Sequence, residues 1–208
     1  MTELEYFYAG HSAFAYIGSK RFMEIAQAAD CPIIHKPNDL RKVIEVNGPG
    51  PQNGKTPERR AYFSRREIER WSEFRGVEIM RGIPTYHHHE ITRLNGVLIA
   101  GILHGHNIDL LAHTMLEAHW RDNADLDDEK TLAAIITSAG LDSKPILDAV
   151  ASPEVATVYA QNTEEAIERS VFGSPTYFVD GDMFYGQDHL DLIERALQKP
   201  FSRTWPTD

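Results

Sequence analysis

Cysteine is almost absent from this chain of 208 residues, which contains one, Cys31. A single cysteine cannot form an intramolecular disulfide, and it cannot supply the two thiols that dithiol redox chemistry needs within one chain. Because Cys31 opens an apolar segment, we expect it to be a buried core thiol. A dithiol oxidoreductase is therefore disfavoured from the start.

The sequence also lacks long apolar runs and an excess of positive charge. No apolar run reaches the roughly 18 residues that a membrane span requires, and residues 1–9 have neither the basic start nor the apolar core of a signal peptide. The 31 Asp and Glu outnumber the 21 Lys and Arg, which gives a net charge of −10. This balance disfavours broad binding to nucleic acid or anionic lipid. We expect a cytoplasmic protein with neither kind of partner.

What is present is the composition of a globular protein, with 42% hydrophobic and 25% charged residues. The beginning of the chain predicts a strand at residues 4–9, which Gly10 and His11 end. Apolar residues at helical spacing then predict a helix over residues 14–29, followed by a second strand at 31–35. A β-α-β unit with connections this short favours a parallel pair of strands.

The rest of the chain changes character twice. Helical patterns dominate its middle part, over residues 92–120, with an interruption around Gly101 and Gly105, and over 128–139 and 153–171. Near the end, two short strands flank Asp180-Gly181, which is typical of a hairpin turn, and a last helix follows.

The order β-α-β, several helices, then β-β-α predicts an α/β protein with a thioredoxin-like fold and an inserted all-helical domain. We assign residues 1–79 and 172–208 to the thioredoxin-like domain and residues 80–171 to the insertion.

Two short segments can carry chemistry in such a fold. Ser12 stands at the predicted start of the first helix, where free backbone N–H groups and the helix dipole stabilise anions, including thiolates. The simpler interpretation is that Ser12 only caps the helix. Pro175, after a Gly-Ser turn and before a strand, is a candidate cis proline that would expose the backbone of Ser174 to an extended ligand. An ordinary trans turn is the alternative. The fold places both segments at one end of the sheet.

Over essentially its whole length, the chain resembles the 2-hydroxychromene-2-carboxylate isomerase family, which is related to kappa-class glutathione transferases and to the DsbA-like group. The resemblance is densest at residues 6–18, 48–79 and 153–197. Its most specific parts are Phe172-Gly173-Ser174-Pro175-Thr176 and Met183-Phe184-Tyr185-Gly186-Gln187-Asp188. One departure is Ala13, because the family often has proline directly after the serine.

The resemblance implies glutathione as cofactor and a set of residues that bind it. Ser12 matches the family's serine that holds the glutathione sulfur, and Asn53 matches an asparagine in the loop after the second strand. Ser174, with Pro175, would pair with the cysteinyl backbone. Gln187 and Asp188 match the pair that binds the γ-glutamyl end.

The implied activity is a glutathione-dependent isomerisation of a small aromatic acid. A serine in place of cysteine leaves the thiolate of bound glutathione free to act as the nucleophile. The main alternative is a kappa-like glutathione transferase that conjugates electrophiles, and a non-catalytic glutathione binder is a third possibility. The resemblance also implies a homodimer.

Ten histidines complete the set of candidate groups. The runs His87-His88-His89 and His104-Gly105-His106 look like metal ligands, but they lack an HExxH-type frame, so we predict no metal site. His11, beside Ser12, is a candidate base or carboxylate-binding residue, and a partly exposed loop histidine is the simpler interpretation.

Overall fold

The computed structural model describes residues 2–48 and 56–203 and contains one four-stranded sheet. Its strands are β1 (Leu4–Tyr8), β2 (Ile33–Pro37), β3 (Thr176–Val179) and β4 (Asp182–Tyr185). The strand order is β2-β1-β3-β4, with β1 parallel to β2 and the other two pairs antiparallel. The predicted thioredoxin-like fold, with its parallel pair and terminal hairpin, is confirmed.

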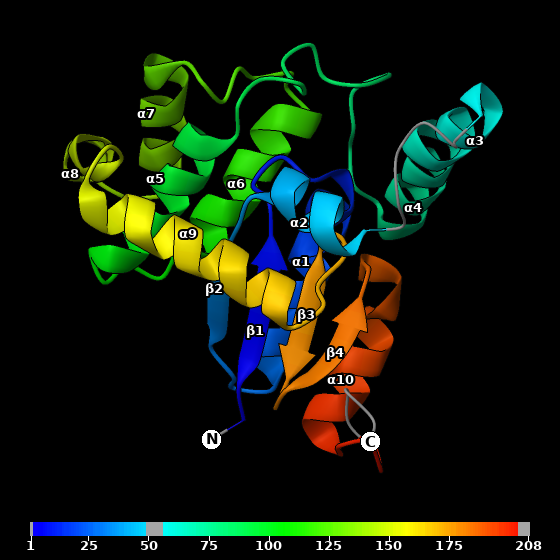
Figure 1. The fold of residues 1–208 in the computed structure, drawn as a ribbon. Helices are drawn as coiled ribbons and strands as arrows, with labels where there is room; N and C mark the ends of the chain where they lie inside the picture. Colours follow the sequence, from blue (N-terminus) through cyan, green and yellow to red (C-terminus); the bar gives the residue numbers. More distant parts are fainter. Residues whose placement is uncertain (1, 49–55, 204–208) are drawn as a thin grey trace.

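Helices occupy most of the chain between β2 and β3, and further helices follow β1 and β4 (Figure 1). They are α1 (Ala13–Ala28), α2 (Leu40–Asn47), α3 (Pro57–Ala61), the π-helical segment η2 (Tyr62–Arg66), α4 (Glu67–Arg75), α5 (Thr92–Leu103), α6 (Asp109–Trp120), α7 (Glu129–Ser138), α8 (Ser143–Ala149), α9 (Pro153–Glu168), the 3₁₀ segment η3 (Gln187–His189) and α10 (Leu190–Gln198). The predicted pattern over residues 92–120 is divided into α5 and α6. The sequence patterns predicted neither α2 nor α8.

The second strand begins two residues later than predicted, and the end of α1 explains the difference. Asp30 adopts a left-handed conformation with φ of 49°, and the N–H of Cys31 donates to the carbonyl of Ala26 at 3.0 Å. These contacts form a helix-terminating turn that uses the N–H of Cys31. Pro32 has no N–H to offer. Pairing with β1 therefore starts at Ile33.

Alternation along β1 divides its side chains between the two faces of the sheet. Phe7 packs with Phe178 and with Val43 of α2 and Ala166 of α9, on the face covered by these two helices. Tyr6 and its neighbours pack against α1, where the ring of Phe22 lies 5.0 Å from that of Tyr6. Figure 1 shows α9 crossing in front of the strands. The sheet is thus buried on both faces.

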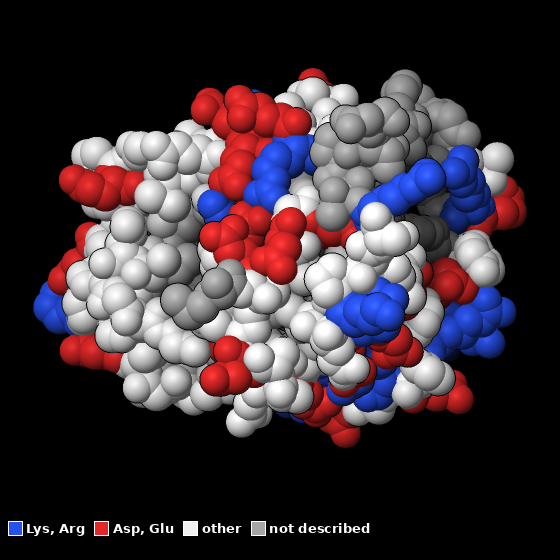
Figure 2. All heavy atoms as spheres, turned by 90° about the horizontal axis from the view of Figure 1, so that it is seen from below, with Lys and Arg blue, Asp and Glu red and all other residues white. Residues whose placement is uncertain are grey.

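The helical block formed by α5, α6, α7 and α8 lies beyond the end of the sheet at which β1 leads into α1 (Figure 1). The chain termini lie at the opposite end, and α3 and α4 project sideways. On the face in Figure 2, Lys and Arg lie in small groups among Asp and Glu. Within residues 2–48 and 56–203, no helix has the length and hydropathy needed to cross a bilayer.

Candidate active site at the start of α1

The turn from β1 into α1 lies against the segment that leads into β3. The Ser174–Pro175 peptide bond is cis, which confirms the prediction for this proline. The N–H of Ala9 donates to Oγ of Ser174 at 3.3 Å, and Oγ of Ser12 donates to the carbonyl oxygen of Ser174 at 3.2 Å. The structure therefore brings Ser12 together with Ser174 and Pro175, although Ser12 and Ser174 are 162 positions apart in the chain.

Ser12 is the N-cap of α1. Its φ and ψ of −72° and 127° are extended, and its Oγ accepts a hydrogen bond from the N–H of Ala15 at 3.4 Å. The residue is buried, with 8% of its surface exposed. A hydroxyl at this place can accept from the helix and still direct its own proton outward to an anion. Capping and anion binding are therefore compatible roles.

Gln187 and Asp188, the other predicted binding pair, follow β4 in η3. Gln187 is 1% exposed. It packs so closely on α1 that a Cβ added to Gly18 would lie only 2.6 Å from the Cβ of Gln187. Arg75, at the end of α4, donates to Oε1 of Gln187 at 3.2 Å and to its backbone oxygen at 3.1 Å. Asp188 is exposed. The structure thus places Gln187 against α1. The remaining predicted residue, Asn53, lies outside the described residues.

Three residues of the insertion and of α4 that hold this site were not predicted. Asn95 of α5 accepts from the N–H of Gly10 at 3.0 Å, and the indole nitrogen of Trp120 in α6 donates to the carbonyl of His11 at 2.8 Å. Arg75 is the third. Asn95 and Arg75 sit within ordinary helical patterns, and their partners are far away in the chain, so no local signal marks them.

His11 belongs to a group of three imidazoles with His87 and His119. The ring of His11 lies 5.0 Å from that of His87 and 6.3 Å from that of His119. Burial lowers the pKa of His11 to about 3 and that of His87 to about 4, and the neighbouring imidazoles add to both effects. His11 is buried, which differs from the interpretation as an exposed loop residue. Among the described residues, no group of three or more His, Cys, Asp or Glu is arranged to hold a metal ion.

The arrangement defines a site at one end of the sheet of a thioredoxin-like fold, with a serine at the start of its first helix. Its parts are a helix N-terminus, a hydroxyl donor and the backbone of a cis-proline turn. Cys31, the one thiol of the chain, is buried elsewhere and donates to the carbonyl of Thr2 at 3.3 Å. Such a site can bind an anion or a thiolate, and it cannot form a disulfide itself.

Comparisons with known proteins agree with this class. A family model described as a DSBA-like thioredoxin domain matches residues 3–198, and the chain belongs to that family. A protein named 2-hydroxychromene-2-carboxylate isomerase from Pseudomonas sp. (strain C18) is 27% identical over 196 residues, which cover 93% of this chain and 89% of that protein. One of the same name from Pseudomonas putida is 25% identical and covers 93% of both chains.

The fold is also that of solved structures. A structure of selenomethionine-labelled 2-hydroxychromene-2-carboxylate isomerase superposes with a TM-score of 0.77 at 24% identity, with 94% of each chain covered. These matches confirm the resemblance seen in the sequence.

Proposed function

We propose that this protein is a glutathione-dependent isomerase of the 2-hydroxychromene-2-carboxylate type, which acts on a small aromatic acid. The observation that carries the proposal is the Ser12 hydroxyl at the N-terminus of α1, beside the Ser174–Pro175 turn. It occurs in a chain that aligns over 93% of its length with relatives bearing that name.

The groups around Ser12 suit glutathione. The hydroxyl of Ser12 donates its proton over a long 3.2 Å contact to the carbonyl of Ser174. A thiolate at the helix N-terminus is a stronger acceptor than a carbonyl, so the hydroxyl would turn to it. The carbonyl of Ser174 would then be free to accept an amide N–H of the tripeptide. Gln187 and Arg75 would offer polar groups to its γ-glutamyl end.

When bound, glutathione would supply a thiolate that adds reversibly to a conjugated acid, so that a double bond can rotate and glutathione is regenerated. The chain's own part is to lower the pKa of that thiol. Ser12 would donate a hydrogen bond to the sulfur, and the N-terminal peptide groups of α1 would add their positive potential. Glutathione, the substrate and the role of Ser12 are all parts of this proposal.

The test is an ultraviolet titration of glutathione bound to the wild type and to Ser12→Ala. We expect a lowered thiol pKa in the wild type and an unshifted one in the variant, together with a loss of turnover of about 100-fold. Because Ser12 is also a helix cap, the free energy of unfolding should fall by about 1 kcal/mol. Ser152→Ala is the matched control, since Ser152 caps α9 in the same way and accepts from Val155 at 3.3 Å.

Ser152→Ala should lose the same stability and keep both the thiol pKa and the turnover. An unshifted thiol pKa in the wild type, or full turnover in Ser12→Ala, would refute the proposal. Product analysis then separates the two glutathione chemistries. Isomerisation leaves the amount of free thiol unchanged, whereas conjugation by a transferase would consume one thiol for each product formed.

A further inference from the structure

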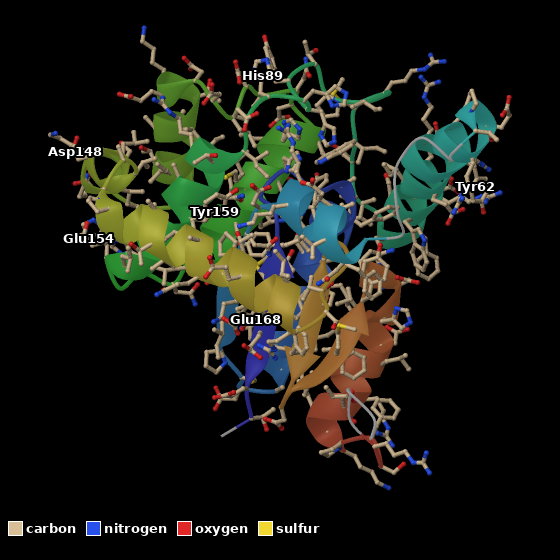
Figure 3. The ribbon with its side chains drawn as sticks, in the orientation of Figure 1. Tyr62, His89, Asp148, Glu154, Tyr159 and Glu168 are labelled. Carbon is tan, nitrogen blue, oxygen red and sulfur yellow. The ribbon has the colours of Figure 1, made fainter. Side chains whose placement is uncertain are left out.

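The histidine group beside Ser12 lies on three separate segments. His11 belongs to the turn before α1, His119 to α6, and His87 to the loop between α4 and α5. Figure 3 shows the labelled residue His89 of this loop at the end of the molecule where the helical block lies. Trp120 fixes the backbone of His11 and contacts the other two rings, with centroid distances of 5.2 Å to His87 and 5.9 Å to His119.

The hydrogen bonds of His119 and His87 determine which nitrogens carry protons. A carbonyl oxygen only accepts, so the 3.3 Å contact from Nδ1 of His119 to Ala124 places a proton on that nitrogen. Neutral His119 then has its lone pair on Nε2, which lies 3.1 Å from Nδ1 of His87. His87 must therefore donate from Nδ1. Its Nε2 is left as an unprotonated acceptor.

The imidazoles are neutral because of what surrounds them. Burial lowers the pKa of His87 and of His119. The charged or titratable groups near His87 are His119, His88, Arg41 and His11. Arg41 of α2 donates to the backbone oxygens of His88 and His89 and pairs with Glu90, so a cation lies beside this loop. A neutral imidazole with a free lone pair is the form that can take a proton.

His11 and His87 line the same small pocket, and one buried nitrogen beside it has no hydrogen-bond partner among the described residues. The pocket has a volume of about 10 Å³, and its other lining residues are Tyr86, His89, Glu90, Ile91, Leu94, Leu126 and Asp127. This is the room of roughly one water molecule or one hydroxyl oxygen. Nδ1 of His11 is buried and makes no hydrogen bond to any residue that the structure describes. An unsatisfied buried nitrogen of this kind is rare and favours a ligand hydroxyl as its partner.

We propose that this pocket receives the hydroxyl group of the substrate and that Nε2 of His87 is its proton acceptor. His119 is a positioning residue that keeps His87 in the accepting tautomer and stabilises its cation through the Nδ1–H bond. The inference rests on the proposed function, because it names the group that handles the proton when the hydroxychromene ring opens and closes.

The step balances without any further reactant. The ring-closed acid carries a hydroxyl and the ring oxygen on the same carbon. Nε2 of His87 takes the hydroxyl proton, and the electron pair of that O–H bond forms the carbonyl. The bond from this carbon to the ring oxygen breaks, and its pair stays on the oxygen as a phenolate. His87 returns the proton to the phenolate, which gives the ring-opened acid.

Turnover of 2-hydroxychromene-2-carboxylate with saturating glutathione tests the role of each histidine. His87→Gln should lower kcat about 100-fold and leave KM within about twofold. His119→Leu should lower kcat about tenfold, and His119→Gln, whose amide oxygen can accept from His87, should restore most of it. His104→Gln is the control, because His104 is an exposed histidine at the end of α5. Each variant should keep the bound glutathione thiolate of the wild type.

A spectrum of the imidazole nitrogens, with ¹⁵N-labelled protein, tests the tautomers independently of activity. We expect protons on Nδ1 of His87 and His119 and none on Nε2 of either residue between pH 6 and 8. A proton on Nε2 of His87, or a His87→Gln variant with wild-type kcat, would overturn the inference. Loss of the thiolate in His87→Gln would also overturn it, since His87 would then serve glutathione binding. A wild type without any thiolate would refute the proposed function itself.

Discussion

The indole nitrogen of Trp120 donates a hydrogen bond of 2.8 Å to the carbonyl oxygen of His11, and thereby connects α6 to the residue directly before Ser12. Both residues are buried. Asn95 of α5 makes the corresponding contact to Gly10. The partners lie 109 and 85 positions further along the chain. The placement of the Ser12 hydroxyl therefore depends on the helical block as well as on the sheet.

Removing the indole donor should loosen this connection. Trp120→Phe keeps an aromatic ring in the core but leaves the buried carbonyl of His11 without a partner, so the free energy of unfolding should fall by about 1–3 kcal/mol. Urea unfolding measures this change. Calorimetry should also show weaker binding of glutathione, because the turn before Ser12 loses the hydrogen bond that holds the backbone of His11 in place. Unchanged stability together with unchanged binding would contradict the role of this contact.

The sequence predicted those parts of the fold that local patterns determine. The strand at the start of the chain, the Asp180-Gly181 turn and the apolar spacing of α1 are each predicted from one local segment, and each is confirmed. The predicted start of β2 at Cys31 is wrong, because the N–H of Cys31 is already bonded to the end of α1. The pattern gives no sign of that bond, which joins the carbonyl of Ala26, in the last turn of α1, to a residue beyond the end of the helix.

The site shows the same division. Ser12 and Pro175 could be predicted because a helix start and a turn before a strand are local signals, and the fold brings them together. Arg75 could not, since its bonds to Gln187 join α4 to η3 across 112 positions. The cluster of His11, His87 and His119 is equally a product of tertiary packing. The sequence shows His87 and His88 side by side, but it gives no sign that the ring of His87 also meets those of His11 and His119, which come from other segments.

Tyr6 and Tyr8 offer a matched pair of hydroxyl deletions. Their rings stack at 4.0 Å on the same face of β1, and both side chains are buried. Tyr8 bonds to Nδ1 of His35 at 3.0 Å, whereas the hydroxyl of Tyr6 is buried without a partner among the described residues. Tyr8→Phe should lower the free energy of unfolding by about 1 kcal/mol, and Tyr6→Phe should leave it unchanged or raise it. Equal losses in urea unfolding would show that Tyr6 has a partner.

The buried neutral state of His11 should make stability depend on pH. In the folded protein, burial and the facing His87, His119, Arg41 and His88 lower the pKa of His11 to about 3. In the unfolded chain, its pKa is near 6.5. As the pH falls below 6.5, the unfolded chain takes up the proton first. The stability present above pH 6.5 is then lost toward pH 3, by up to about 1.4 kcal/mol per pH unit.

Urea unfolding between pH 4 and 8 measures this slope. His11→Gln should reduce the slope by about one proton below pH 6. His104→Gln replaces an exposed histidine and should leave the slope as in the wild type. A wild-type slope in His11→Gln would mean that His11 is already protonated in the folded protein.

Asp109 provides a second pH-dependent contact, between the start of α6 and β2. Burial alone would raise the pKa of this carboxyl, but its hydrogen bonds to His35, at 2.8 Å, and to Asn107 outweigh burial and lower it. A lowered folded pKa means that the contact stabilises the protein above the unfolded value near 3.9, and that this stability is lost as the pH falls through the folded pKa. Asp109→Asn should therefore lower the free energy of unfolding by about 1 kcal/mol at pH 7.

The difference between Asp109→Asn and the wild type should shrink below pH 4 and vanish once both side chains are neutral. Asp191→Asn is the control, because Asp191 is an exposed carboxylate in the first turn of α10 and has the same favourable position relative to a helix dipole. Asp191→Asn should lower the free energy of unfolding only by the small contribution of the helix dipole. If both variants lost the same stability at pH 7, the helix dipole would account for the effect of Asp109, and the bond to His35 would contribute nothing of its own.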